Sequence, residues 1–145
     1  MRRGHMSRFR VVELVIATLV LLTFNATAFQ TKDGPAVSIT GVPRAGQGGP
    51  DATDSISGKA KGVDFREHRV VIYAFAANGV WYVQPTVASP LTLIDSNGNW
   101  ENSTYLGRVY GALLVKKTYK PRPTMDALPD VGGDILAVDT VAGKK

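Results

Sequence analysis

The sequence contains no cysteine, and its only two histidines are His5 and His68. Without cysteine the chain can form no disulfide, no thiolate metal site and no cysteine nucleophile. His5 falls in a segment that we expect to be removed from the mature protein, so a two-histidine metal site cannot form either. We therefore predict no metal, no cofactor and a fold that depends on packing alone.

The sequence motifs of common catalytic sites are also missing. The chain has no G-x-S-x-G nucleophile pattern, no phosphate-binding loop and no dinucleotide fingerprint. Asp95 and Glu101 can be compared with a glycosidase carboxylate pair, but both lie beside one small hairpin. No insertion that could form a cleft accompanies them. The sequence therefore predicts a protein that is not an enzyme.

No apolar run is long enough for a typical membrane-spanning helix, which needs roughly twenty residues. The chain begins with the basic segment "MRRGHMSRFR", continues with the shorter apolar run Val11–Phe24, and then has small residues at Ala26 and Ala28. This order is typical of a secretory signal, with cleavage expected after Ala28. We predict a secreted or periplasmic protein with no stable membrane span after cleavage. An uncleaved N-terminal membrane anchor is the alternative.

The basic charge of the chain belongs partly to this signal. Residues 1–28 contain four of the seventeen Lys and Arg residues and one of the twelve acidic residues, which leaves 13 basic and 11 acidic residues and a net charge of +2. The remaining charges are evenly mixed along the chain. Such a distribution does not suit a nucleic-acid partner, so we predict none.

The composition divides the mature chain into a tether and one domain. Residues 29–54 are rich in Gly, Pro and small polar residues, and we interpret them as a flexible tether with one short strand at 37–42 and a loop at 43–54. Residues 55–145 form the predicted domain. Together they are long enough to bury a core without disulfides.

The domain shows short strand patterns and no apolar stripe of helical period. The predicted strands are Ser55–Lys61, Arg69–Ala76, Val80–Gln84, Leu91–Ile94, Asn99–Ser103, Val109–Lys116 and Asp134–Val141. About seven strands at this spacing predict an all-β fold, an antiparallel β-sandwich. The Pro- and Gly-rich stretch "TYKPRPTMDALPDVGG" is expected to be a long crossover before the last strand, with one helical turn at Thr124–Leu128.

The pair Asn78-Gly79 is a strong hairpin signal, and we expect a type I′ turn there. This turn would pair Ala76 with Trp81 and Phe75 with Tyr82. Since side chains alternate along a strand, one face would be an apolar core: Val70, Ile72, Ala74, Ala76, Trp81 and Val83. The other face would carry Val71, Tyr73, Phe75, Tyr82 and Gln84.

This second face could act as a binding surface. Aromatic rings stack on the apolar face of a sugar while hydroxyl and amide groups reach its polar rim, so Tyr73, Phe75, Tyr82 and Gln84 are candidate ligand-binding residues. The alternative is that the rings pack beneath a neighbouring loop, because cross-strand aromatic pairs stabilise sheets without any ligand.

The stretch "LIDSNGNWENS" places Asp95, Asn97 and Asn99 at alternate positions. A type I′ turn on Asn97-Gly98, or a type I turn that starts at Asp95 with Gly98 left-handed in a bulge, would account for the pattern. A helix–loop–helix calcium site is excluded because its glycine and glutamate positions are not matched. A looser calcium loop through the three residues remains an alternative. We expect Trp100, which follows the turn, at the edge of the core.

Several marks in residues 55–141 also resemble a known family. They are Gly58, Trp81, the "PLT" at Pro90–Thr92, the D-x-x-G-x-W pattern at Asp95–Trp100, Asn102, and Gly132-Gly133-Asp134. These marks resemble a small exported bacterial β-sandwich module that occurs alone or attached to envelope proteins and polysaccharide-degrading enzymes. The resemblance implies an immunoglobulin-like or carbohydrate-binding-like sandwich and supplies no catalytic residue.

Together the sequence predicts an exported, non-catalytic binding or scaffold module of the bacterial envelope or extracellular space. Its expected partner is an envelope protein, bound by protein interaction. The alternative is a polysaccharide, bound by the aromatic sheet face.

Overall fold

The computed structural model describes residues 33–145, so the predicted signal segment, residues 1–28, lies outside the described residues. The described part is all-β, with eight strands and no helix: β1 (Ala36–Gly41), β2 (Thr53–Lys61), β3 (His68–Phe75), β4 (Trp81–Gln84), β5 (Asn99–Tyr105), β6 (Val109–Lys116), β7 (Thr124–Met125) and β8 (Ile135–Ala142). Among these residues there is accordingly no apolar helix that could cross a membrane.

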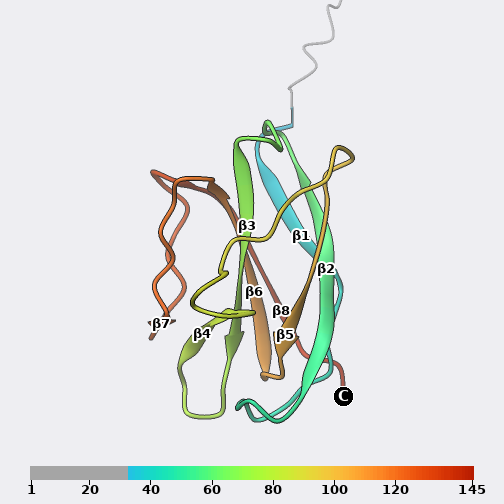
Figure 1. The fold of residues 1–145 in the computed structure, drawn as a ribbon, viewed down its shortest axis with the longest axis vertical. Helices are drawn as coiled ribbons and strands as arrows, with labels where there is room; N and C mark the ends of the chain where they lie inside the picture. Colours follow the sequence, from blue (N-terminus) through green and yellow to red (C-terminus); the bar gives the residue numbers. More distant parts are fainter. Residues whose placement is uncertain (1–32) are drawn as a thin grey trace, which may run out of the picture. The chain divides into compact units, whose positions relative to one another are not determined.

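The strands form two antiparallel sheets that pack as a sandwich (Figure 1). The smaller sheet has the order β1-β2-β5, and the larger has the order β7-β4-β3-β6-β8. The core between them is made by buried residues of both sheets, among them Ile56, Val70, Ile72, Ala74, Trp100, Tyr110, Ala112 and Leu114. The predicted β-sandwich is confirmed, and its immunoglobulin-like character stays a prediction.

The domain begins earlier than the predicted residue 55. Strand β1 pairs with β2 along its length, for example Val37 with Ala60, and so forms one edge of the smaller sheet. The loop after β1 is also held by the domain, since the Ala45 N–H donates to the Lys144 carbonyl at 2.7 Å. Glycines and prolines made residues 29–54 resemble a linker. In the described part of this segment, β1 and the loop after it are held by hydrogen bonds to residues elsewhere in the chain.

Two predicted local elements are wrong. Leu91–Ile94 is not a strand, because only Thr92 pairs, through two backbone hydrogen bonds of 2.8 and 3.0 Å with Val70. Thr124–Leu128 contains no helical turn, and its first two residues form β7 beside β4. The Val83 N–H donates to the Pro123 carbonyl at 3.0 Å, which continues this pairing. Tertiary pairing partners decided the conformation of both segments.

Candidate functional site

The β3–β4 hairpin has a different register from the predicted one. Phe75 pairs with Trp81 and Ala74 with Tyr82, one residue away from the register that a type I′ turn would impose. The Gly79 N–H donates to the Ala76 carbonyl at 3.0 Å, and only Gly79 in this loop has a positive φ, of 82°. A type I′ turn needs positive φ at both central residues. The loop is instead a type I turn followed by a left-handed glycine.

Because of this change of register, each side chain of β4 lies on the face of the sheet opposite to the predicted one. Trp81 leaves the core between the sheets and packs on the outer face of the larger sheet, half-buried, with its ring 4.9 Å from the ring of Phe75. Tyr82 and Gln84 turn to the inner side, next to Ala74. The prediction that Trp81 lies in the main core is therefore wrong, whereas Trp100 is buried there, at 2% exposure.

The four candidate ligand-binding residues do not share a face. Tyr73 is fully buried on the outer face, and its hydroxyl donates to the Arg122 carbonyl at 2.8 Å. Residues of the crossover, 118–133, cover this face through Tyr119, Met125 and Leu128. Tyr82, at 38% exposure, lies on the opposite side of β4. A flat platform of the three rings, as expected for a sugar-binding sheet, is not formed.

The loop at Asp95 repeats the geometry of the β3–β4 loop. The Gly98 N–H donates to the Asp95 carbonyl at 3.0 Å, and Gly98 has a φ of 82°. Of the two predicted turns, the type I turn that starts at Asp95 is the one that forms. Asp95 Oδ1 accepts the backbone N–H groups of Asn99 at 2.8 Å and Asn97 at 2.9 Å, and these hydrogen bonds lower the pKa of the carboxyl group.

Asp95, Asn97 and Asn99 thus shape a turn in this structure. Within residues 33–145 no three His, Cys, Asp or Glu side chains are grouped so that they could hold a metal ion. The single histidine of this part, His68, has its Nδ1 atom 2.8 Å from the Asp64 carbonyl in a surface turn. Asp95 and Asn99 also line a shallow hollow on the smaller sheet, which is described below.

Side-chain oxygens engage three of the backbone N–H groups at the free edge of β5. The backbone N–H groups of Asn99, Ser103 and Tyr105 donate to Asp95 Oδ1 at 2.8 Å, Asn102 Oδ1 at 2.8 Å and Gln84 Oε1 at 2.9 Å, respectively. An edge strand with free N–H groups can pair with a strand of another protein. Because these three groups are already engaged, the β5 edge is poorly suited to such pairing.

Gln84 also joins the two sheets. Its side chain is 3% exposed, it comes from β4, and it accepts a hydrogen bond from β5. At the opposite edge of the sandwich, Asp139 Oδ2 of β8 accepts the Ile39 N–H of β1 at 2.8 Å. Gln84 was predicted as a ligand-binding residue. In the structure its side chain connects β4 to β5, and it also lines a groove between β4 and the loop after β1.

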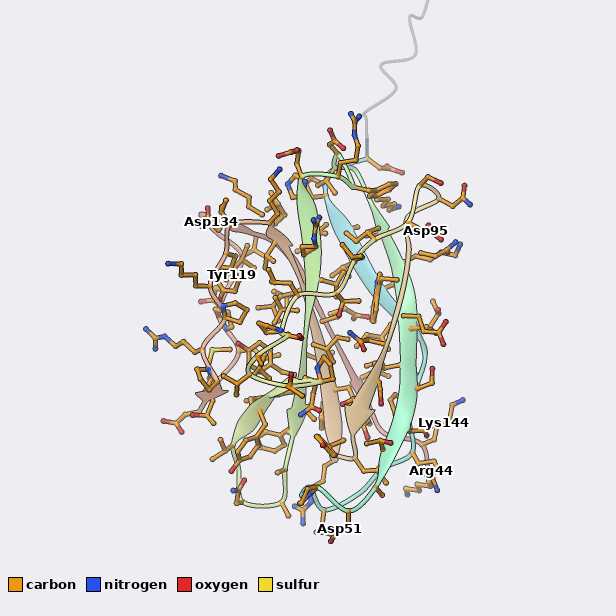
Figure 2. All side chains as sticks on the ribbon, viewed as in Figure 1. Arg44, Asp51, Asp95, Tyr119, Asp134 and Lys144 are labelled. Carbon is orange, nitrogen blue, oxygen red and sulfur yellow. The ribbon has the colours of Figure 1, made fainter. Side chains whose placement is uncertain are left out.

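This groove is the best-formed candidate site of the described residues. It lies beside the β3–β4 hairpin and the loop after β1, which meet at the same end of the sandwich; Asp51 marks this end in Figure 2. Its volume is about 620 Å³, within the usual range of roughly 300–1,000 Å³ for ligand sites. The lining residues are Gln47, Gly48, Gly49, Pro50, Ala74, Ala76, Ala77, Asn78, Tyr82, Val83, Gln84, Pro85, Thr86, Val87, Tyr105 and Leu106.

The groove exists because small residues line part of it. A Cβ atom on Gly48 would lie 2.6 Å from the Cβ atom of Ala76, closer than atoms of real side chains approach, and Gly48 also has a φ of 99°. Ala74 and Ala76 add only methyl groups. Tyr82 and Val87, with exposures of 38% and 64%, are the large side chains that a ligand could contact. Sequence patterns had singled out Tyr82 but not Val87 or Gly48.

None of the lining residues carries a charge. The polar side chains are the amides of Gln47, Asn78 and Gln84 and the hydroxyls of Tyr82, Thr86 and Tyr105. An uncharged wall of this kind favours an uncharged ligand, because a charged group would lose its hydration without gaining an opposite charge. The sequence offered no signal for this, since the lining comes from four separate segments.

A second hollow, of about 610 Å³, includes residues of the outward face of the smaller sheet. Its polar side chains bind one another: Lys59 Nζ donates to Asn99 Oδ1 at 3.0 Å, and the neighbouring Ser55 Oγ donates to Glu101 Oε1 at 3.0 Å. Such pairs are typical of a sheet face in contact with solvent. We therefore regard the groove as the candidate site.

The comparisons with known proteins do not add to this geometry. No protein-family model, no curated protein and no solved structure matches the chain.

Proposed function

We propose that the protein is an exported, non-catalytic module that binds an uncharged segment of a partner protein in the groove between β4 and the loop after β1. The observation that carries this proposal is the absence of any charged residue from the lining of a groove of ligand-binding size. Export is inferred from the basic, apolar and small-residue order of residues 1–28.

A binding role suits the chemistry of the groove better than a catalytic role. The lining contains no carboxylate, imidazole, thiol or amine that could transfer a proton near neutral pH or attack a substrate. The hydroxyl of Tyr82 accepts a hydrogen bond from Asn78 Nδ2 at 2.7 Å, and no base lies next to it in the lining. These groups can orient a ligand, but they cannot activate one.

The predicted carbohydrate-binding function is the weaker candidate. It required several exposed rings on one face, and Tyr73 and Phe75 lie under or beside the crossover, on the side of the larger sheet opposite to Tyr82 in the groove. Tyr105 is the second ring of the lining, but it is partly buried. A neutral sugar could still contact Tyr82, so sugars belong in the test.

The test introduces a charge into the groove without disturbing the core. In Val87→Asp the new carboxylate replaces a side chain that is 64% exposed, so the fold should be unaffected while binding of an uncharged ligand is lost. Val131→Asp is the matched control, since Val131 is 61% exposed and lies in the crossover, outside the groove. Amide chemical shifts of the isotope-labelled full chain would be recorded with blocked neutral peptides, charged peptides and neutral oligosaccharides.

We expect shifts at groove residues with at least one neutral compound, loss of these shifts in Val87→Asp, and no loss in Val131→Asp. If every neutral compound leaves the groove amides unchanged, or if binding survives Val87→Asp and maps to the smaller sheet, the groove is not the binding site. Binding of charged peptides alone would contradict the argument from the uncharged lining.

A further inference from the structure

We propose that Asn97 is a site of spontaneous deamidation, a covalent modification that converts its side-chain amide to a carboxylate. Asparagine is a thermolabile residue, and it reacts most readily when glycine follows it. The chain contains two Asn-Gly pairs, Asn78-Gly79 and Asn97-Gly98. Because both pairs lie in hairpin loops of the same geometry, the first pair is an internal reference for the second. The reaction requires no ligand and is independent of the groove.

The reaction needs only the chain and water. The backbone nitrogen of Gly98 loses its proton to solvent, and its electron pair forms a bond to Cγ of Asn97. The bond from Cγ to Nδ2 then breaks and ammonia leaves, so that a cyclic succinimide remains. Water opens either carbonyl of this ring to give aspartate or isoaspartate, with no change in oxidation state. Glycine favours the attack because it has no Cβ atom beside the attacking nitrogen.

The attacking nitrogen has the same surroundings in both loops. The Gly79 N–H donates to the Ala76 carbonyl at 3.0 Å, and the Gly98 N–H donates to the Asp95 carbonyl at 3.0 Å. Both glycines have a φ of 82°, and both asparagines are exposed to water. A difference in reaction rate between the loops must therefore come from the asparagine side chains.

The side chain of Asn78 is held at both of its polar atoms. Its Oδ1 atom accepts the Val80 N–H at 3.1 Å, and its Nδ2 atom donates to the Tyr82 hydroxyl at 2.7 Å. Turning the amide towards the Gly79 nitrogen and releasing Nδ2 would break these hydrogen bonds. The fold therefore restrains Asn78 from deamidation.

In the second loop, Asp95 takes the hydrogen bond that would hold Asn97. The N–H group that corresponds to that of Val80 belongs to Asn99, and it donates to Asp95 Oδ1 at 2.8 Å. Asp95 corresponds to Ala76 of the first loop, which has no side-chain oxygen. Within residues 33–145, Asn97 contributes only its backbone N–H to such bonds, at 2.9 Å to Asp95 Oδ1. Its amide can turn towards the attacking nitrogen without breaking a hydrogen bond.

Deamidation would weaken this turn. Isoaspartate adds a methylene group to the backbone after residue 97, and either product places a second carboxylate near that of Asp95, where like charges repel. Asp95 and Asn99 also line the hollow on the smaller sheet, so that surface would change irreversibly with time. Figure 2 shows Asp95 at the end of the sandwich opposite to Asp51, which marks the end where the groove lies.

The test incubates the folded full chain in mildly alkaline buffer and follows each asparagine by peptide mass spectrometry with fragmentation. Asn97 should react at least about tenfold faster than Asn78, because the hydrogen bonds of Asn78 must break first. In denaturant both pairs lose their loops, so the two rates should become similar. If Asn78 reacts as fast as Asn97 in the folded chain, or if Asn97 stays intact while the unfolded chain reacts, the proposal is wrong.

Two variants test the cause of the difference. Tyr82→Phe removes the acceptor of Asn78 Nδ2 and should speed the reaction at Asn78 while that at Asn97 is unchanged. Asp95→Ala gives the second loop the side chain of the first and frees the Asn99 N–H for Asn97, so it should slow the reaction there. Melting curves show whether each variant is folded. An unchanged rate at Asn78 in folded Tyr82→Phe, or a faster rate at Asn97 in folded Asp95→Ala, would contradict the role of these hydrogen bonds.

Discussion

Replacing Tyr110 by Phe removes one hydroxyl that joins three parts of the sandwich. Tyr110 stands at the start of β6 and is fully buried. Its hydroxyl accepts the Gly107 N–H at 2.9 Å and donates to the Arg44 carbonyl in the loop after β1. A tyrosine that bonds back to the backbone at a strand start is also a feature of immunoglobulin domains, where it fixes a corner between strands.

The expected loss of stability follows from the two hydrogen bonds. Each contributes about 1 kcal/mol, and an unpaired buried N–H costs about 1–3 kcal/mol. Since Gly107 is buried and would lose its acceptor, Tyr110→Phe should lower the free energy of unfolding by about 2–3 kcal/mol. Tyr73→Phe is the matched comparison: the ring is equally buried, but its hydroxyl makes only the bond to the Arg122 carbonyl. That variant should lose only about 1 kcal/mol.

Denaturant unfolding of the parent and both variants measures these differences, and the dependence on denaturant should be the same for all three if the folded states bury equal surface. Hydrogen exchange of the Gly107 amide gives an independent readout, because its protection should fall in Tyr110→Phe only. The reasoning is refuted if Tyr110→Phe is as stable as Tyr73→Phe, or if the exchange of the Gly107 amide is unchanged.

Two further predictions concern the tryptophans and Asp95. Trp100→Ala should cost about 3–5 kcal/mol in denaturant unfolding because it empties the core, whereas Trp81→Ala, on the partly exposed outer face, should cost clearly less; equal losses would contradict the register. The N–H groups of Asn99 and Asn97 lower the pKa of Asp95. The carboxylate therefore stabilises the fold at pH values above its ordinary pKa of 3.8, and this stabilisation is lost as the pH falls through the lower pKa of the folded state. Between pH 5 and pH 2 the melting temperature of the Asp95→Asn variant should therefore fall less than that of the parent. Equal falls in the two proteins would contradict this.

The strand pattern was predictable because it depends on local chemistry. Alternating apolar residues and turn residues located seven of the eight strands closely, and the Asp95 turn was one of two predicted forms. The segments that failed depend on partners distant in sequence. Leu91–Ile94 has strand-forming residues, but only Thr92 meets a partner, and Thr124–Met125 is extended because β4 lies beside it.

The candidate site was less predictable than the fold. Asn78-Gly79 closes a tight hairpin in either register, and the difference of one residue exchanges the faces of Trp81 and Tyr82. Gln84 was chosen for its neighbours on a predicted aromatic face, but in the structure it accepts the Tyr105 N–H and lines the groove. Val87 and Gln47 lie in loops without a sequence motif, and only the folded chain brings them together.

The sequence by itself determined the all-β class, the turns at Asn78-Gly79 and Asp95–Asn99, and the absence of cysteine chemistry, because each of these depends on the conformational preference or the chemistry of residues near one another in the chain. The tertiary structure alone decided the register of β4, the cover of Tyr73 by the crossover, and the uncharged groove. These depend on hydrogen bonds and contacts between residues that are far apart in the chain, such as the 2.8 Å bond from Tyr73 to Arg122, and no local pattern records which distant group will be the partner.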